Sequence, residues 1–505
     1  MKFKILIGKN FKNFIVIYDL KTPKDFEIYE VIKKVLTRSE YFPFMTGFNK
    51  TITYSYLFNE YIFPVQFWPD VKRQIDKFDS EISVLENEEL MYQNDVNRED
   101  FDNWLLSCKF PEEITIDSEN YLYQRDSVFL AIQNKIGRIE VATAGGKTFI
   151  TYLYCRYLFD NFIHETKKFL VVVPSKVLAN QLKNDFLGYD KYFERHLCVE
   201  TIFAGSKKIL EADIICGTFQ SLGNYEQEYF DDFGVFICDE THRAKAYTIR
   251  NEIFAKLLNC EYYFAMTGTM AKYNTLDYLH IVSMFGDELV KRTAAENIRD
   301  GVSTPIKINA IQINYLTKNN YSQDLIESGI IGIDKFRAEK EFFHLYDKRT
   351  KLISKLLNAF SGNSLILVDT VEYCGILYDF LSKECSDSGW KFFIITGEVK
   401  NREEIIENMR HAKDHYCIIA TYGTMSTGVS IKNIEYLYFP DGGKSEIRIR
   451  QSLGRGMRLF PNKEFCIVFD FQDQIPKCSF RSHSRERMRI YHEQGFPVKI
   501  TKVEI

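Results

Sequence analysis

Short apolar segments separated by helical stretches constrain the fold of this chain more than any other feature. They recur from about residue 165 onward and are continuously apolar rather than alternating. Continuous runs suit parallel strands buried on both faces, and their alternation with helices predicts βαβ units with right-handed crossovers. We therefore expect an α/β fold with parallel sheets. The expected strands are Phe169–Val173, Ile214–Cys216, Val235–Cys238, Tyr262–Met266, Leu365–Val368, Phe392–Ile395, Tyr416–Ala420, Glu435–Phe439 and Cys466–Phe469.

Polar or glycine-containing turns follow most of these strands. Gly, Asp and Thr also end strands for conformational reasons, so a single turn of this kind carries no functional information. A repeated series favours function, because ligands of open α/β sheets bind at the carboxyl ends of the strands. The turns are Pro174-Ser175, Gly217-Thr218, Asp239-Glu240, Thr267-Gly268-Thr269, Asp369-Thr370, Thr396-Gly397 and Thr421.

A phosphate-binding loop is indicated between an expected strand, Ile139–Val141, and an expected helix, Phe149–Phe159. In such loops the N–H groups at a helix start face the anion, and glycines let the backbone approach it closely. Lys147 would reach the β- and γ-phosphates, and the Thr148 hydroxyl would bind Mg²⁺. Val141 stands where the GxxxxGK[ST] pattern has its first Gly, which is one departure from it. The triphosphate-binding residues expected here are Ala144, Gly145, Gly146, Lys147 and Thr148.

Two adjacent carboxylates, Asp239 and Glu240, follow the expected strand Val235–Cys238. Alone, such a pair serves equally well as a helix N-cap or a solvated turn. Together with the phosphate loop, it predicts that Asp239 holds Mg²⁺ through water and that Glu240 orients or deprotonates the water attacking the γ-phosphate. The expected metal site comprises Thr148, Asp239 and Glu240.

Two further segments extend this site. Tyr123-Gln124 lies about 20 residues before the loop, and a Gln amide can pair with an adenine edge while an aromatic ring stacks on the base. A surface Gln is the alternative. Near the other end of the chain, Arg455 and Arg458 lie three residues apart on one expected helical face, shortly after Gln451. They would act as arginine fingers if this face meets the phosphate loop across a cleft; the alternative is an exposed basic helix.

Composition narrows the class of protein. The formal net charge of −4 argues against a wholly basic nucleic-acid binder but leaves room for a local basic groove. The 11 cysteines form no CxxC pair, which fits free thiols in a reducing cytosol and neither a disulfide framework nor a zinc site. We expect no signal peptide and no membrane span, and therefore a cytoplasmic protein.

The chain divides into regions of different pattern. Residues 1–110 contain alternating segments, Phe3–Ile7 and Phe14–Tyr18, that predict an antiparallel hairpin around Asn10, followed by a helix near Phe26–Thr37. The stretch from roughly 290 to 345 lacks a clear strand series and is expected to contain a linker. The predicted organisation is a small N-terminal α/β domain (1–110), two parallel-sheet domains (111–295 and 296–475) and a basic helical tail (476–505).

The order of these segments resembles that of superfamily 2 helicases over residues 112–475. The resemblance implies two tandem RecA-like domains and ATP hydrolysis with Mg²⁺ as cofactor. Catalysis would involve Lys147, Asp239, Glu240, Gln451, Arg455 and Arg458. The matching segments are Tyr123-Gln124 (Q motif), 142–148 (motif I), 173–181 (Ia), 217–222 (Ib), 239–242 (II, DExH type), 267–269 (III), 365–370 (IV), 420–431 (V) and 451–458 (VI).

The same resemblance implies two more sets of residues. Nucleic acid would lie across both domains and contact Pro174, Ser175, Thr218, Thr370 and Thr421. Hydrolysis would be coupled to strand movement through His242, Thr267, Thr269 and Gly428.

Segments 98–105 and 420–430 are similar to those of phage recombination and repair helicases. This narrower resemblance implies an enzyme that remodels forks, R-loops and Holliday junctions in the cytoplasm of an infected bacterium. Its partners would be branched or single-stranded DNA, RNA in R-loops, and single-strand-binding or recombination proteins. Ser430 departs from the Asp found there in many superfamily 2 members.

Three alternatives remain open at this stage. A duplex translocase would share every motif without separating strands, and an RNA helicase would share most of them. A protein of a different class, a non-catalytic junction-binding or annealing scaffold, has no need of Lys147, Asp239 and Glu240.

Overall fold

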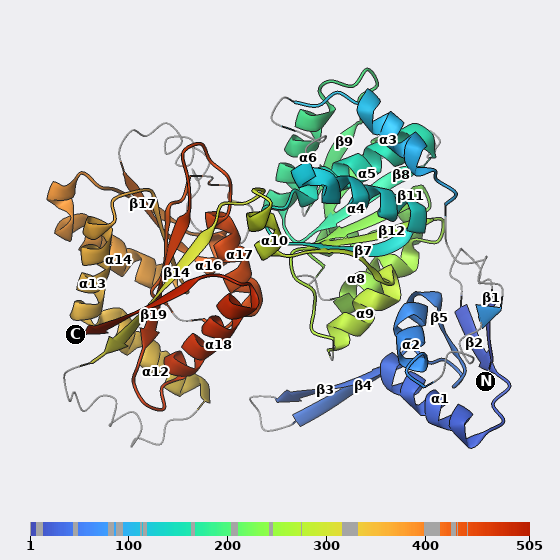
Figure 1. Ribbon diagram of the computed structural model, residues 1–505, viewed down its shortest axis with the longest axis horizontal. Helices are drawn as coiled ribbons and strands as arrows, with labels where there is room; N and C mark the ends of the chain where they lie inside the picture. The colour runs from blue at the N-terminus through green and yellow to red at the C-terminus, as the bar shows by residue number, and fades with distance from the viewer. Residues whose placement is uncertain are drawn as a thin grey trace. The chain divides into compact units, whose positions relative to one another are not determined.

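The computed structural model describes residues 2–6, 14–43, 49–78, 85–86, 94–111, 114, 119–162, 167–203, 211–241, 246–273, 275–315, 332–397, 415–425, 431, 433–441 and 443–505. The chain forms two compact units (Figure 1). Unit 1 is Met1–Val141 with Gly146–Arg292, and unit 2 is Ala142–Gly145 with Thr293–Ile505.

Unit 1 is built around a parallel sheet whose seven described strands have the order β13-β7-β12-β11-β8-β10-β9. Each strand expected in this region is present. The strands are β7 (Ile136–Val141), β8 (Lys168–Val173), β9 (Val199–Ile202), β10 (Ile214–Thr218), β11 (Phe233–Asp239), β12 (Tyr262–Thr267) and β13 (Glu288–Arg292); the helices beside them are α3 (Arg98–Ser107), α4 (Leu122–Asn134), α5 (Lys147–Asn161), α6 (Lys176–Asp190), α7 (Phe219–Leu222), α8 (Ala246–Glu252) and α9 (Leu276–Phe285).

Burial on both faces explains why these strands are continuously apolar. In β8, Phe169 and Val171 pack into one core with helices α3 to α6, whereas Leu170 and Val172 pack into another with α8 and α9. Successive side chains of a strand point to opposite faces, so a sheet with two covered faces needs apolar residues at every position. The two helical layers are visible in Figure 1.

The N-terminal part of unit 1 has a sheet of its own. Strands β1 and β2 form the expected antiparallel hairpin, with Lys2 opposite Tyr18, and the order of the sheet is β5-β2-β1-β6. Strands β3 and β4 form a separate two-stranded antiparallel ribbon. The elements are β1 (Lys2–Leu6), β2 (Phe14–Tyr18), α1 (Pro23–Leu36), β3 (Thr37–Pro43), β4 (Asn49–Ser55), β5 (Ile62–Pro64), α2 (Trp68–Ile75) and β6 (Leu85–Glu86).

This N-terminal part packs directly on α9. Leu279 and Val282 of α9 belong to the same apolar core as the N-terminal strands and helices. The hydroxyl of Tyr56 lies 2.8 Å from His280 Nδ1 and accepts a hydrogen bond from Ser283 Oγ at 2.9 Å. Arg73 adds an ion pair to Asp287 at 3.1 Å. Helix α9 is therefore shared by two cores.

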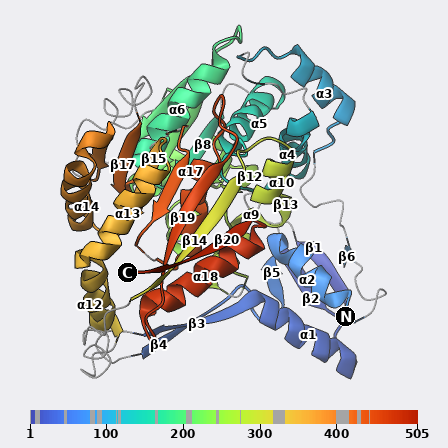
Figure 2. The same ribbon diagram turned by 60° about the vertical axis from the view of Figure 1, so that its left-hand side comes forward.

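Unit 2 contains a second parallel sheet, whose seven described strands have the order β16-β17-β15-β18-β19-β14-β20. Helices α13 and α14 cover one face and α17 and α18 the other (Figure 2). The strands are β14 (Ile306–Asn314), β15 (Ser364–Val368), β16 (Lys391–Ile395), β17 (Tyr416–Thr421), β18 (Tyr436–Phe439), β19 (Cys466–Asp473) and β20 (Val498–Glu504); the helices are α10 (Ala294–Arg299), α12 (Gly332–Leu345), α13 (Asp347–Ala359), α14 (Val371–Glu384), α16 (Tyr422–Met425), α17 (Glu446–Gly456) and α18 (Ser479–Glu493).

The two sheets confirm the expected fold class, two tandem RecA-like domains plus a small N-terminal α/β region. Two features were not expected. The stretch from 290 to 345 holds β14, an interior strand between β19 and β20. The C-terminal segment is only partly helical, because β20 follows α18 and extends the sheet. Both strands alternate in burial, a pattern weaker than a continuous apolar run.

Helix α18 carries the basic segment near the C-terminus, and its arginines have structural partners. Arg487 is buried and pairs with Asp470 of β19 at 2.7 Å. On the same strand, Asp473 pairs with the buried Arg349 of α13 at 3.0 Å. The exposed Arg489 pairs with Glu446 and Glu486. The basic segment therefore packs as a helix on the second sheet, where the buried ion pair between Arg487 and Asp470 holds it.

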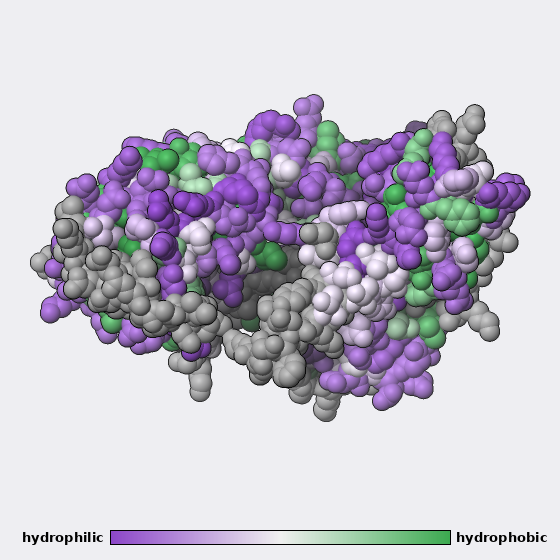
Figure 3. Space-filling view, turned by 90° about the horizontal axis from the view of Figure 1, so that it is seen from below, coloured by the Kyte–Doolittle hydropathy of each residue, from purple (hydrophilic) through white to green (hydrophobic). Residues whose placement is uncertain are grey.

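All 11 cysteines are free thiols, as expected. None of the helices in the described part of the chain combines the length and the apolar character that a membrane span requires. In the view of Figure 3, hydrophilic side chains cover much of the described surface, and apolar side chains form smaller separate patches.

The buried His280 gives unit 1 a pH dependence. Burial, reinforced by the positive charge of Arg250, lowers the pKa of His280 to about 4 from its ordinary value of 6.5. The unfolded chain therefore binds the proton more tightly, and stability falls as the pH drops from about 6.5 toward 4. We expect a loss of about 2 kcal/mol in unfolding free energy between pH 7 and pH 5. Urea unfolding at both pH values measures it. His280→Gln should flatten this dependence, and an unchanged slope in that variant would contradict the assignment.

Candidate nucleotide-binding site

The phosphate loop joins β7 to α5, as the sequence predicts. It turns through a hydrogen bond from the N–H of Gly145 to the carbonyl oxygen of Ala142, and Ala144 and Gly146 have φ values of +69° and +80°. Gly146 is the N-cap of α5, so Lys147 is the first residue of that helix. The first N–H groups of a helix lack intrahelical partners and suit an anion.

Gln124 packs against this loop. A Cβ atom on Gly146 would lie 2.3 Å from Gln124 Nε2, so the position requires glycine for space as well as for its positive φ. Gln124 is buried, and its amide donates a hydrogen bond to the Tyr123 hydroxyl at 3.2 Å. The guanidinium of Arg292 lies 4.4 Å from the centre of the Tyr123 ring. Gln124 thus lies beside the loop and contacts Tyr123, and Arg292 packs on the Tyr123 ring.

Asp239 and Glu240 lie at the carboxyl end of β11, beside the loop lysine. Lys147 Nζ is 3.8 Å from Glu240 Oε1 and donates a hydrogen bond to the Val141 carbonyl at 3.3 Å. Glu240 has a φ of +50°, a conformation that costs energy in a non-glycine residue. Two hydrogen bonds hold its N–H, one to Asp239 Oδ1 at 2.9 Å and one to the Met266 carbonyl at 2.8 Å.

The bond to Met266 ties the acidic pair to the next strand. Asp239 is in register with Met266 of β12, and β12 also pairs with β7, which leads into the phosphate loop. Directly after Met266, the buried Thr267 donates a hydrogen bond to the Thr269 carbonyl at 2.7 Å and accepts one from the Thr269 N–H at 3.2 Å. The carboxyl ends of three adjacent strands therefore carry the loop, the acidic pair and the Thr267-Thr269 turn.

The donor set fits a magnesium ion. A threonine hydroxyl and carboxylates are hard oxygen ligands, and Mg²⁺ in nucleotide sites is held by one or two such groups with phosphates and water completing its shell. Thr148 lies at the start of α5 and Asp239 at the end of β11, both in unit 1.

In unit 2, Gln451 and Arg455 lie on α17, and Arg458 follows the end of that helix. Arg455 is 8% exposed. The Arg458 carbonyl accepts hydrogen bonds from Thr304 Oγ1 and Lys463 Nζ, each at 3.0 Å, and Lys463 also donates to the Gly456 carbonyl at 2.6 Å. Burial lowers the pKa of the Lys463 ammonium. A cation at a helix C-terminus stabilises the exposed carbonyls, so Lys463 fixes the end of this helix.

The residues expected to contact nucleic acid also lie at strand ends. Pro174 and Ser175 follow β8, Thr218 ends the neighbouring β10, and Thr218 is in register with Val173. In unit 2, Thr421 ends β17 in register with Val368 of β15, and Thr370 comes two residues later.

Their hydroxyl groups are engaged locally. Ser175 accepts a hydrogen bond from the Leu178 N–H and Thr370 from the Tyr373 N–H, which makes both N-caps of helices. Thr421 Oγ1 lies 2.8 Å from Thr424 Oγ1, and Thr218 Oγ1 lies 2.9 Å from Ser221 Oγ. Local hydrogen bonds thus account for these hydroxyls, and their contacts with nucleic acid remain predictions.

Two of the expected coupling residues, His242 and Gly428, lie outside the described residues. Three residues that contact predicted site residues had not been predicted: Arg292 beside Tyr123, and Thr304 and Lys463 on the Arg458 carbonyl. A cation shortly after a helix C-terminus was a usable signal for Lys463. Arg292 and Thr304 carry no sequence signal, because their partners are distant along the chain.

Comparisons with known proteins agree with this geometry. Residues 86–272 match the family model described as Type III restriction enzyme, res subunit, and residues 347–460 match the Helicase conserved C-terminal domain. Together with the two RecA-like sheets, these matches show an ATP-dependent helicase that resembles the superfamily 2 helicases.

The particular protein that it resembles is the ATP-dependent DNA helicase uvsW of Enterobacteria phage T4. The two are 28% identical over 391 residues, which cover 75% of this chain and 74% of the phage protein. Transcript termination protein A18 of Fowlpox virus is 21% identical to this chain. The aligned residues cover 57% of this chain and 61% of the viral protein. In fold, the chain is similar to a fragment assigned as the HsdR subunit of a type I restriction enzyme from Vibrio vulnificus YJ016, with a TM-score of 0.58, 16% identity and coverage of 95% and 82%.

Substitutions of Lys147 and Glu240, which pair with each other, test their assignment to ATP hydrolysis. We expect Glu240→Gln to lower the kcat of ATP hydrolysis by at least about 100-fold, because the carboxylate that activates water is lost. Nucleotide affinity should stay within a few-fold. Lys147→Ala should lose both hydrolysis and binding, because it removes a phosphate contact. Steady-state ATPase assays and nucleotide titrations measure these effects.

Lys191→Ala supplies the control, since this exposed lysine lies in the same unit and is not one of the residues assigned to the site. Thermal unfolding should show that all variants are folded. Wild-type turnover in Glu240→Gln would refute the assignment.

Proposed function

We propose that this chain is an ATP-dependent DNA helicase or translocase that remodels branched DNA such as forks, R-loops and Holliday junctions. The observation that carries the proposal is the pairing of Lys147 with Glu240 across the ends of β7 and β11. The similarity to a phage DNA helicase supports DNA as the substrate. The corresponding cellular setting is recombination, repair or replication in the cytoplasm of a phage-infected bacterium.

ATP binding would replace an existing interaction. Lys147 and Glu240 face each other at 3.8 Å, and the triphosphate would separate them, with Lys147 turning to the β- and γ-phosphates. Thr148 and Asp239 would hold Mg²⁺, which neutralises charge on the phosphates. Glu240 would then orient the attacking water. Its backbone is fixed by two hydrogen bonds, so the carboxylate needs little reorganisation.

The direct bond from Glu240 to β12 suggests how hydrolysis is communicated. A shift at Glu240 would move the Met266 carbonyl, and Thr267 and Thr269 follow in the same turn. We assign Thr267 and Thr269, together with His242 and Gly428, to the coupling between hydrolysis and strand movement. In this scheme γ-phosphate contacts shift the population between open and closed domain arrangements.

The proposed domains follow the sequence. Residues 111–295 would bind ATP, residues 296–475 would supply Gln451, Arg455 and Arg458 to the γ-phosphate, and residues 1–110 would add DNA binding. Backbone N–H groups at the strand ends near Ser175, Thr218, Thr370 and Thr421 would hold the phosphates of one strand. Such contacts position nucleic acid without reading its sequence.

RNA helicase activity is the second candidate, because two viral relatives are named as ATP-dependent RNA helicases. A translocase without strand separation is the third, favoured by the likeness in fold to a restriction subunit. RNA within R-loops, single-strand-binding proteins and recombination proteins are the further partners that we propose.

The deciding experiment compares ATPase rates with single strands, duplexes, forks, four-way junctions and single-stranded RNA. We expect the highest rates with forks and junctions, and less stimulation by RNA. Two further assays separate unwinding from translocation. Strand displacement measures unwinding, whereas triplex displacement measures translocation along a duplex without unwinding. A rate that no DNA raises, or that RNA raises most, would contradict the proposal.

The buried Arg455 gives a second prediction. We expect Arg455→Ala to lower kcat by roughly 1000-fold while ATP affinity changes little, because a finger stabilises charge that develops in the transition state. Arg485→Ala on the exposed side of α18 is the matched control. Circular dichroism and thermal unfolding check folding. Weakened ATP binding with unchanged turnover would count against the finger role.

A further inference from the structure

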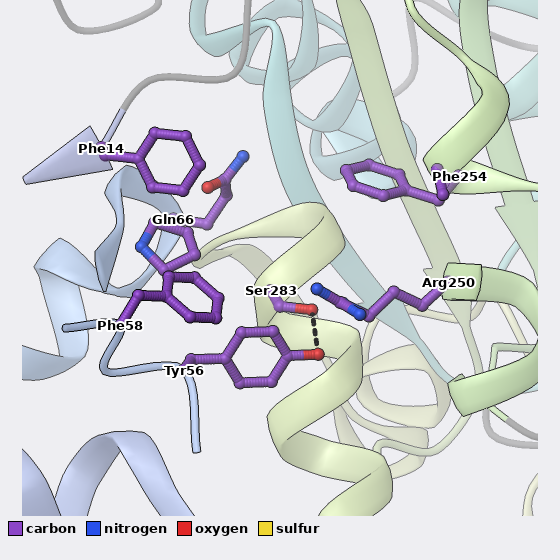
Figure 4. Close-up of a pocket in the computed structure, with 9 residues that line it drawn as sticks. Phe14, Tyr56, Phe58, Gln66, Arg250, Phe254 and Ser283 are labelled. Carbon is purple, nitrogen blue, oxygen red and sulfur yellow. Dashed lines mark hydrogen bonds between the residues drawn. The ribbon is translucent and has the colours of Figure 1, made fainter. Parts of the chain in front are cut away.

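A cavity of about 150 Å³ lies where the N-terminal part of unit 1 meets the helices after the acidic pair (Figure 4). One wall comes from the N-terminal part and carries Phe14 of β2, Phe58 and Gln66. The opposite wall carries Arg250 of α8 and Phe254. None of these residues has a role in the ATP site.

The aromatic rings are held in place. Phe58 begins a tight turn closed by hydrogen bonds with Ile62 in both directions, at 2.6 and 2.9 Å. Its ring meets Phe14 edge to face, with centroids 6.3 Å apart, and is 37% exposed. Phe254 on the opposite wall is buried. Rings fixed on two sides of a small cavity suit a planar ring system, because aromatic faces stack on one another.

Gln66 supplies a polar group of the kind that reads a base edge. The residue is 9% exposed, and none of the described residues is recorded as a hydrogen-bond partner of its side-chain amide. Figure 4 shows this amide beside the Phe14 ring at the cavity. An amide offers both donors and an acceptor, so it can pair with a ligand edge that carries both kinds of group. A ligand with a donor–acceptor edge would satisfy it.

Arg250 adds positive charge. Its guanidinium lies 4.8 Å from the centre of the Tyr56 ring, and its recorded hydrogen bonds go to the neutral Tyr54 hydroxyl and Asn251 Oδ1. The cavity therefore combines stacking faces, an amide and a guanidinium, which complement the face, edge and phosphate of one nucleotide.

We propose that this cavity receives an unpaired base of single-stranded DNA, with the base between Phe58 and Phe254, its edge at Gln66 and its phosphate near Arg250. This inference rests on the proposed function as a DNA enzyme and assigns the N-terminal part a site of its own. A protein segment with an exposed aromatic residue is a different occupant, which the nucleic-acid complementarity makes less suitable.

A base bound in this cavity would contact the helices that follow the hydrolysis motifs. Arg250 belongs to α8, the described helix after the acidic pair, and the cavity also contacts Ser283 of α9, the helix after the Thr267-Thr269 turn. Ser283 in turn hydrogen-bonds to Tyr56 of the N-terminal part. A base held here would bridge the N-terminal part and the two helices that follow the hydrolysis motifs.

The test uses the full-length protein and a single-stranded oligodeoxynucleotide that carries 2-aminopurine, whose fluorescence falls when it stacks. We expect the wild type to quench this probe. Phe58→Ala and Gln66→Leu should each weaken single-strand binding by about five-fold or more, the lower end for loss of one stacked base. Affinity for a blunt duplex and the ATPase rate without DNA should stay unchanged.

Phe26→Ala is the matched control, because Phe26 is a 54% exposed phenylalanine of α1 that does not line the cavity. Wild-type single-strand affinity in both cavity variants, or an equal loss for single strand and duplex, would overturn the inference. So would photocrosslinking of a 5-iodouracil probe to peptides remote from Phe58. If the wild-type ATPase responds to no DNA, the proposed function fails as well; normal stimulation with unaffected cavity variants removes this inference alone.

Discussion

The structure depends on burying parallel strands on both faces. In the three strands β8, β11 and β12 nearly every side chain is apolar and buried, so these strands offer no room for polar groups along their length. Polar chemistry is thereby confined to the strand ends, where the chain leaves the core. Adjacent parallel strands end at the same edge, which is why Lys147, Glu240 and Thr267, far apart in sequence, gather there.

Sequence reasoning succeeded where a local pattern has a local cause. Continuous apolar runs marked most interior strands, and the alternating segments at the N-terminus marked the β1–β2 hairpin. The phosphate loop was identifiable because its glycines serve backbone geometry: Gly146 has a φ of +80° and no space for a Cβ atom. The acidic pair was recognisable because it directly follows a buried strand. The placement of the phosphate loop, acidic pair and motif III turn followed from topology alone.

The remaining features depend on long-range contacts that leave no local signal. Strand β14 alternates in burial and was missed, although it is an interior strand. Tyr56 and His280 hydrogen-bond across 224 residues, and only the folded chain shows that α9 serves two cores. The hydroxyls of Ser175 and Thr370 illustrate the opposite case, since their sequence positions suggested binding while the structure uses them as helix caps.

The pairing of β14 with β20 has a consequence for biosynthesis. Residue 308 is in register with residue 498, and β19 reaches β14 from residues 466 to 473. During translation, β14 is synthesised long before its two neighbours, β19 and β20. Both of its edges therefore remain unpaired until those strands have been made. Sheets whose strands are distant in sequence form slowly, and their unpaired, aggregation-prone edges stay exposed until pairing is complete. Unit 2 should therefore mature after translation has passed β20, and nascent chains halted between β14 and β19 should be the ones that engage chaperones.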